Sequence, residues 1–316
     1  MIRDLWSAER RQTCEDLREA VAADVEVHGF YPLKRLQGAD CLIAQLYGPM
    51  LRAFSDLQRR PYVLLANAFE GGDWVASTGD FIGSFVEDWL GIPANGGTVK
   101  FRYGEFCRIR DGKIHEIRFL VDLPDLIRQA DRAILPTSYG RDMWIPGPLA
   151  GDGLRPADVD EAESEATLAL VEAMIFGGLN KYDQKHQESQ GLERFWPEDM
   201  VWHGPVGIGS AYGMEEFLCN AQGPIVGAFP DRKGVGHQAR IAEGIYAAST
   251  GWPSLVGTHR GEFLGWQPTG RQVGWNIMDF WRREGEFLSE NWVLIDLIDA
   301  ALQSGVELYP ALRAYE

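Results

Sequence analysis

The chain has 316 residues, of which 45% are hydrophobic, and a formal net charge of −16. This length predicts two domains, and the apolar content excludes an intrinsically disordered chain. The acidic balance argues against a nucleic-acid partner, because phosphate backbones are bound by clusters of Lys and Arg. Four cysteines without CxxC spacing predict free thiols in a reducing compartment.

The sequence shows no segment for export or for a membrane. The N-terminal residues lack the apolar core of a secretory signal, and no run approaches the roughly 18 apolar residues that span a bilayer. We therefore expect a cytoplasmic protein without a membrane partner.

The first half of the chain places helices before strands. Residues 3–23 and 38–54 have apolar side chains at helical intervals, and a short strand over 25–32 lies between them. Residues 63–122 read as strands broken by glycine. Helices followed by an antiparallel meander predict the α+β class.

A Pro- and Gly-rich stretch follows this meander and separates two similar halves. We expect a first domain over 1–132, a linker over 133–157 and a second domain over 158–316. The second domain begins with Asp and Glu side chains, which favour the N-terminus of a helix.

The second half repeats landmarks of the first at nearly constant offsets, which indicates a tandem duplication. The offset is 175 for the early landmarks, 172 in the middle strand and 174 in the closing stretch. The matched pairs are Val27–Gly29 with Trp202–Gly204, 53-AFSD-56 with 228-AFPD-231, 76-ASTG-79 with 248-ASTG-251, and Asp122 with Asp296.

At these landmarks the sequence resembles the SnoaL-like polyketide cyclase family of the nuclear-transport-factor-2-like superfamily. The residues that carry the resemblance are 202-WHGP-205, 228-AFPD-231, 263-FLGWQPTGRQV-273 with its twin 89-WLGIPANGGTV-99, and the closing strand with Asp122 or Asp296. The resemblance implies two fused cone-shaped α+β barrels, each a curved antiparallel sheet wrapped around N-terminal helices. Such a tandem is expected to form an intrachain pseudo-dimer and leaves further oligomerisation open.

The resemblance also implies an aldol-type ring closure with an aspartate as general acid/base and without a metal or cofactor. The family's aspartate falls on Asp122 and Asp296, and an apolar cone would raise the pKa of such a carboxyl into the range useful for proton transfer. The alternative is that this aspartate caps the helix that follows it. Both roles are compatible.

The family's histidine, fourteen residues before the aspartate, is replaced by Arg108 and Arg282. Arginine cannot act as a base, but it can stabilise an enolate or bind a carboxylate. The alternative is a salt bridge to Glu116 or Glu290. The choice depends on the register of the hairpin, because a slip of one residue reverses every side chain.

Histidines and tryptophans supply the other candidates. His28 and His203 lie on the first strand of each copy and could orient substrate or pack in the core, and His259 is confined to copy two. The second half of the chain is also richer in tryptophan, which suits a ring-containing ligand. We therefore expect the functional pocket in the second half. The expected substrate-binding residues are Trp202, Trp275, Asn276, Trp281, Glu290, Trp292, His28, Arg108 and His259.

These observations predict a cofactor-independent acid/base enzyme, a cyclase, isomerase or lyase, for a hydrophobic, aromatic or polyketide-like small molecule. The expected catalytic residues are Asp296, Asp122, His203 and Arg282, and no metal site is expected because no His/Asp/Glu trio has ligand spacing. The alternatives are a dehydratase or hydrolase for an unrelated substrate, or a non-catalytic small-molecule-binding pseudo-dimer.

Overall fold

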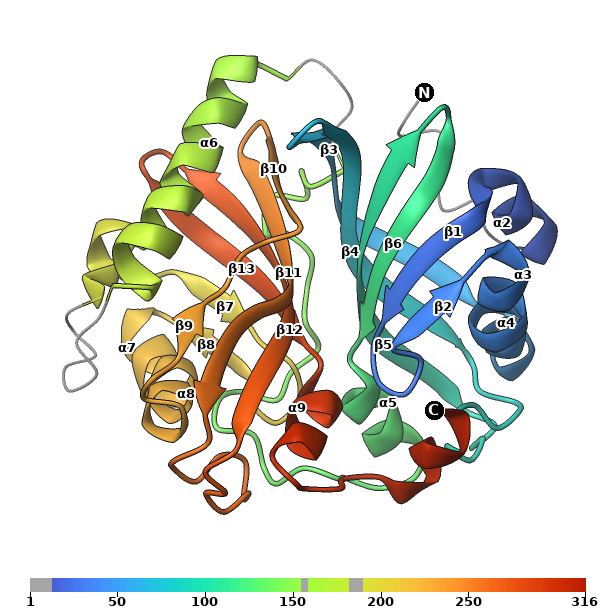
Figure 1. The fold of residues 1–316 in the computed structure, drawn as a ribbon. Coiled ribbons are helices and arrows are strands. Elements are labelled where there is room, and N and C mark those ends of the chain that lie inside the picture. Colours follow the sequence, from blue (N-terminus) through green and yellow to red (C-terminus); the bar gives the residue numbers. More distant parts are fainter. Residues whose placement is uncertain (1–12, 155–158, 182–189) are drawn as a thin grey trace. The chain divides into compact units, whose positions relative to one another are not determined.

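The computed structural model describes residues 13–154, 159–181 and 190–316. The chain divides into two compact units, of which unit 1 is Met1–Ile134 with Tyr309–Glu316 and unit 2 is Leu135–Leu308. Each unit combines one predominantly antiparallel sheet with several helices, so the predicted α+β class and the two cone-shaped barrels are confirmed (Figure 1).

Unit 1 contains a six-stranded sheet in the order β2-β1-β6-β5-β4-β3. Its pairings are antiparallel except that β1 runs parallel to β6. The elements are α2 (Cys14–Ala20), β1 (Val21–Gly29), β2 (Arg35–Gln37), α3 (Ala39–Leu42), η2 (Ile43–Tyr47), α4 (Gly48–Ala53), β3 (Gln58–Phe69), β4 (Gly72–Ser84), β5 (Thr98–Arg110), β6 (Lys113–Val121), α5 (Leu123–Ala130) and η7 (Pro310–Tyr315).

Unit 2 repeats this plan with a sheet in the order β10-β11-β12-β13-β7-β8, in which β9 also pairs with β11 and β7 runs parallel to β13. A long helix, α6, lies along β10 (Figure 1). The elements are α6 (Glu161–Met174), η3 (Ile175–Leu179), η5 (Leu192–Arg194), β7 (Val201–His203), β8 (Ser210–Tyr212), α7 (Met214–Phe217), η6 (Leu218–Gln222), α8 (Gly223–Ala228), β9 (Lys233–Gly234), β10 (Ala239–Glu243), β11 (Tyr246–Thr258), β12 (Gln272–Glu284), β13 (Phe287–Ile295) and α9 (Leu297–Gln303).

The closing hairpin has the same register in both units. Two-residue loops join β5 to β6 and β12 to β13, because Arg110 pairs with Lys113 and Glu284 with Phe287. A register shift follows Arg108 in unit 1 and Arg282 in unit 2. The different glycine positions in the two turns therefore leave the register unchanged.

Aromatic side chains form the core at the same place in both units. In unit 1, Phe54 stacks on Phe85 with ring centroids 4.8 Å apart. In unit 2, Phe229 stacks on His259 at 5.2 Å and meets Trp275 edge-on at 4.9 Å. These rings pack the helical turns against the sheet and so hold the interior side chains of each unit in place.

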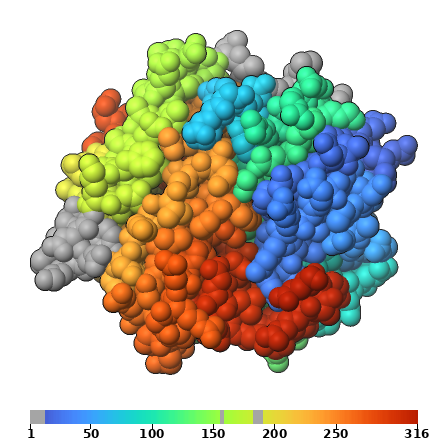
Figure 2. All heavy atoms as spheres, in the orientation of Figure 1, coloured from blue at the N-terminus to red at the C-terminus, as the bar shows by residue number. Residues whose placement is uncertain are grey.

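The C-terminal segment belongs to unit 1 although it follows unit 2 along the chain. The Tyr309 hydroxyl lies 3.2 Å from the carbonyl oxygen of Gly91 and 3.2 Å from a carboxylate oxygen of Asp131. Figure 2 shows the red C-terminal atoms against the blue and cyan atoms of unit 1. At the other boundary, unit 2 begins at Leu135, within the stretch 133–157 that we expected to be a linker.

Candidate active site

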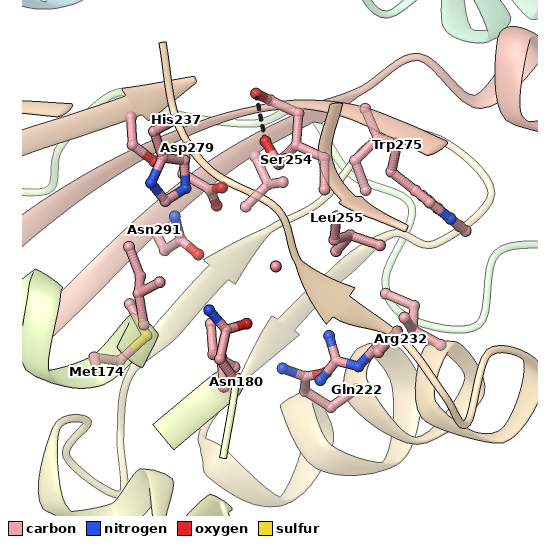
Figure 3. A pocket seen from close by; sticks show the side chains of 18 of the residues that line it. Met174, Asn180, Gln222, Arg232, His237, Ser254, Leu255, Trp275, Asp279 and Asn291 are labelled. Atoms are coloured by element: carbon pink, nitrogen blue, oxygen red, sulfur yellow. Dashed lines mark hydrogen bonds between the residues drawn. The ribbon is translucent and has the colours of Figure 1, made fainter. Parts of the chain in front are cut away.

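A cavity of about 430 Å³ lies inside unit 2. Its floor is the face of β11, β12 and β13 that meets the helical turns η3, η6 and α8, and β9 with the residues after it borders one side (Figure 3). Four tryptophans line it: Trp196, Trp202, Trp275 and Trp281. A volume of this size with aromatic walls suits a small ring-containing molecule.

Strand alternation decides which side chains reach the cavity. Trp275, Ile277, Asp279 and Trp281 of β12 line it, and so do alternate residues of β13, beginning with Asn291. Successive side chains of a strand point to opposite faces of a sheet, so the residues between these belong to the other face. Among the cavity-lining residues of β12, one side chain is therefore ionisable.

That side chain is the carboxyl of Asp279. Burial raises the pKa of Asp279 to about 7, although a hydrogen bond from the side chain of Asn291 opposes the shift. Asn291 is held in turn by donating from Nδ2 to the carbonyl oxygen of Phe280 at 3.0 Å. An aspartate poised near neutral pH can both take up and return a proton, as general acid/base catalysis requires.

His237 borders the same end of the cavity, where Figure 3 shows its ring and the Asp279 carboxyl. Its Nδ1 lies 3.1 Å from Nη1 of Arg240. Because a guanidinium only donates, Nδ1 accepts this bond and the proton of the neutral ring is on Nε2. Burial and the charge of Arg240 lower the pKa of His237 to about 4, so the ring is neutral at pH 7 and can donate through Nε2–H.

The raised pKa of Asp279 makes the stability of the protein depend on pH. The folded protein retains the proton up to about pH 7, whereas the unfolded chain releases it near pH 4, so stability falls as pH rises through this window. Between pH 5 and pH 8 we expect the wild-type protein to lose about 2–3 kcal/mol more than the Asp279→Asn variant. Urea unfolding of both proteins at each pH measures this, and parallel curves would contradict the assignment.

A second group of polar side chains lies on the helical side of the cavity. It consists of Asn180, Gln222 and Arg232. Nη2 of Arg232 donates to Oε1 of Gln222 at 3.1 Å. In Figure 3 these two side chains lie together, away from Asp279 and His237.

Three of the expected binding residues line the cavity, namely Trp202, Trp275 and Trp281. The aspartates taken from the family resemblance lie elsewhere. Asp296 is the N-cap of α9, where its carboxylate accepts from the backbone N–H of Asp299 at 3.1 Å. Asp122 is the N-cap residue of α5, and its carboxylate lies 3.5 Å from Nη2 of Arg102. Neither aspartate is among the cavity-lining residues.

Arg282, Glu290 and Trp292 lie on the face of the sheet opposite the cavity, where they hold the segment 146–152. Nη2 of Arg282 lies 3.3 Å from Oδ2 of Asp152, and Oδ1 of the same carboxylate accepts from the Tyr246 hydroxyl. The backbone N–H of residue 149 donates to Glu290 at 3.1 Å, and Nε1 of Trp292 donates to the carbonyl oxygen of residue 146 at 2.9 Å. These residues anchor the segment 146–152 on the sheet of unit 2.

The Asp152→Ala variant tests this anchor. Burial disfavours the ionised Asp152 carboxyl, but hydrogen bonds from Tyr246 and Arg282 outweigh it and lower its pKa. Removing the carboxylate leaves the buried Tyr246 hydroxyl without this acceptor, so we expect a loss of about 1–3 kcal/mol in the free energy of unfolding. The exposed Glu286→Ala is the control in urea unfolding, and equal stabilities would show that the segment is not anchored here.

The remaining candidates occupy structural positions. His203 stacks on Trp292 and lies 3.3 Å from the Ser210 hydroxyl, and His259 replaces in unit 2 the ring of Phe85 in unit 1. The backbone carbonyl oxygen of Asn276 accepts from the backbone N–H of Asp296 at 3.1 Å. None of these three side chains is among the cavity-lining residues.

The two remaining candidates of unit 1, His28 and Arg108, lie on strand surfaces. Nε2 of His28 is 3.1 Å from a carboxylate oxygen of Glu26, and burial followed by the charge of Arg118 lowers the pKa of His28. Arg108 is exposed and lies over the ring of Trp74, 6.0 Å from its centroid.

Unit 1 fills the equivalent interior with an ion pair. Nη2 of Arg59 lies 2.6 Å from Oε2 of Glu105, and its guanidinium lies 4.2 Å from the ring centroid of Tyr103. Both side chains of the pair are buried. Glu105 stands at the position of Asp279, because each pairs with the matched serine of the neighbouring strand.

The strand register also identifies the position in unit 2 that matches Arg59. Arg59 pairs with Phe81 and Gly234 pairs with Leu255. Phe81 and Leu255 pair in turn with Phe101 and Trp275, which are 174 residues apart. Unit 2 thus has a glycine where unit 1 has the arginine that enters its interior, and the cavity lies beside this glycine.

Sequence reasoning missed Asp279, His237, Asn180, Gln222 and Arg232. One signal for Asp279 was present, since the closing repeat begins with Glu105 in copy one and Asp279 in copy two. Residues 231–240 have no strand or helix periodicity that would have pointed to Arg232 and His237. Over the described ranges there is no cluster of three or more His, Cys, Asp or Glu side chains that could hold a metal ion. Within those ranges, no helix is both long and apolar enough to cross a membrane.

Comparison with known proteins adds three solved structures and one family. AclR from Streptomyces galilaeus is 24% identical, covers 45% of this chain and 86% of its own, and has a TM-score of 0.36. IdmH from Streptomyces antibioticus is 26% identical, covers 45% of this chain and 98% of its own, and has a TM-score of 0.34. TsrD from Streptomyces laurentii is 20% identical, covers 42% of this chain and 95% of its own, and has a TM-score of 0.36. None of the curated proteins matches the chain. The profile of the SnoaL-like polyketide cyclase family matches residues 1–130 and 180–304, and the chain therefore belongs to this family.

Proposed function

We propose that unit 2 is a cofactor-independent acid/base enzyme, a cyclase, isomerase or lyase, for a hydrophobic ring-containing small molecule of polyketide-like chemistry. The observation that carries this proposal is the aspartate Asp279, which has a pKa raised to about 7 and lies on the floor of a tryptophan-lined cavity of about 430 Å³. Membership in a family of polyketide cyclases supports the same class of reaction.

In the proposed reaction, the Asp279 carboxylate removes a proton from a carbon next to a carbonyl group. The C–H electron pair moves into the carbonyl, so an enolate forms and Asp279 becomes a neutral acid. A neutral His237, as donor through Nε2–H, would stabilise the enolate oxygen. In a cyclase the enolate carbon attacks a second carbonyl of the same molecule, and Asp279 returns its proton to the new alkoxide. Every proton and electron pair is accounted for without an oxidant.

Exchange of solvent deuterium into the α-carbons of 2-tetralone, a bicyclic ketone, tests the reaction class. The wild-type protein in the presence of EDTA should accelerate exchange over buffer, as followed by proton NMR, because proton removal from the α-carbon is the first step. Binding of 2-tetralone, followed by tryptophan fluorescence, is measured in parallel. Binding without any acceleration would contradict an acid/base enzyme and favour a non-catalytic binding protein.

A further inference from the structure

The cavity of unit 2 offers two chemically different ends to one bound molecule. Asp279 and His237 lie at one end, and Gln222 and Arg232 lie together elsewhere on its border (Figure 3). Gln222 is the last residue of η6, and Arg232 directly precedes β9. A molecule that fills the cavity therefore meets a proton-transferring carboxyl and a guanidinium at separate positions.

The second end is a group of hydrogen-bond donors with a positive charge. Arg232 carries only donors, and one of them is bound by Oε1 of Gln222 at 3.1 Å. Because the arginine uses the amide oxygen, Gln222 has its NH₂ group to offer to a ligand. Asn180 adds a second amide to the cavity border. Guanidinium and amide N–H groups together match a carboxylate, which accepts several charge-assisted hydrogen bonds.

Unit 1 shows that the fold does not need these polar side chains. Leu57 stands where unit 2 has Arg232, and both backbone N–H groups close the same turn, at 3.2 Å to Phe54 and 3.1 Å to Phe229. Tyr47 ends η2 as Gln222 ends η6. The same turns are thus built with an apolar and an aromatic residue in the unit whose interior holds the Arg59–Glu105 pair. Unit 2, which contains the cavity, has arginine and glutamine at these positions instead.

We infer that the substrate of unit 2 carries a carboxylate, which Arg232 binds together with Gln222 and Asn180. This inference rests on the proposed function and names its substrate class, a ring-containing carboxylic acid. The carboxylate would be held at the guanidinium, the rings would lie against the tryptophans, and the reacting carbon would then face Asp279. Bidentate binding of a carboxylate by arginine also fixes the orientation of the whole molecule.

The test compares 2-naphthoate with 2-naphthamide, which have the same rings and nearly the same shape but differ in charge. Isothermal titration at pH 7.5 should show that the wild-type protein binds 2-naphthoate at least about tenfold more tightly. The Arg232→Leu variant, which carries the residue found in unit 1, should lose about 10- to 100-fold in affinity for 2-naphthoate and change less than about threefold for 2-naphthamide. Arg232→Lys should retain part of the preference. Thermal melting confirms that the variants fold.

Equal affinities of the wild-type protein for the two ligands would overturn the inference, and so would an unchanged preference in Arg232→Leu or a failure of both ligands to bind. The same titrations in the Asp279→Asn variant separate this inference from the proposed function. If the Asp279→Asn variant still prefers the carboxylate, the inference holds even if the wild-type protein does not catalyse deuterium exchange. Conversely, deuterium exchange without a carboxylate preference leaves the acid/base reaction intact and removes only the substrate class.

Discussion

Deuterium exchange into 2-tetralone is expected to slow by about 100- to 10,000-fold in the Asp279→Asn variant, because the carboxylate that takes the proton is gone. An amide has nearly the same shape, so the fluorescence change on binding should persist. In the wild-type protein the rate should rise with pH and level off above about pH 7, since only the ionised carboxyl of Asp279 is a base. A pH-independent rate would contradict this role.

The matched control is Asp296→Asn, which changes the aspartate suggested by family resemblance. Asn is as good an N-cap as Asp, so α9 should keep its cap and the exchange rate should stay within about threefold of wild type. If Asp296→Asn loses exchange while Asp279→Asn keeps it, the base is Asp296 and the assignment from the cavity is wrong.

Replacing Arg59 by Leu is expected to lower the free energy of unfolding by about 3–5 kcal/mol, because it leaves the carboxylate of Glu105 inside unit 1 without this cation. The Glu105 side chain is fully buried, so water cannot replace the guanidinium. The loss should shrink as pH falls, since protonation removes the buried charge. Urea unfolding at pH 5 and pH 8 measures both effects.

The double variant Arg59→Leu/Glu105→Leu distinguishes loss of an ion partner from loss of packing. Replacing both members of a buried pair by apolar side chains is often neutral or stabilising, so the double variant should recover most of the lost stability. A double variant as unstable as Arg59→Leu would show that the stacking of Arg59 on Tyr103, and not the charge, holds the interior together.

The fold could be predicted from the sequence because the duplication places the same landmark residues twice along the chain. Asp122 and Asp296 occur at matched positions 174 residues apart, and in both units they begin the helix that follows the last strand of the sheet. The N-cap alternative for these aspartates came from the same local pattern, and for Asp296 the structure shows the capping hydrogen bond. Local patterns of this kind depend on neighbours in the chain, which the sequence displays directly.

The site depends on long-range register, which the sequence does not display. The sequence does not show the shift in strand pairing after Arg282, nor the second shift between Gly251 and Leu255 of β11. The docking of Asp152 on Arg282 joins residues that are far apart in the chain and have no shared pattern. Three of the four tryptophans expected at the site line the cavity, whereas none of the expected ionisable residues does.

The return of Tyr309–Glu316 to unit 1 has a consequence for biosynthesis. A ribosome completes the first unit only after it has made all of the second, so a nascent chain that has reached residue 134 still lacks the Tyr309 hydroxyl that contacts Gly91 and Asp131. Unit 2, in contrast, is one uninterrupted stretch. Unit 1 therefore becomes complete only after all of unit 2 has been synthesised, although most of unit 1 is translated first.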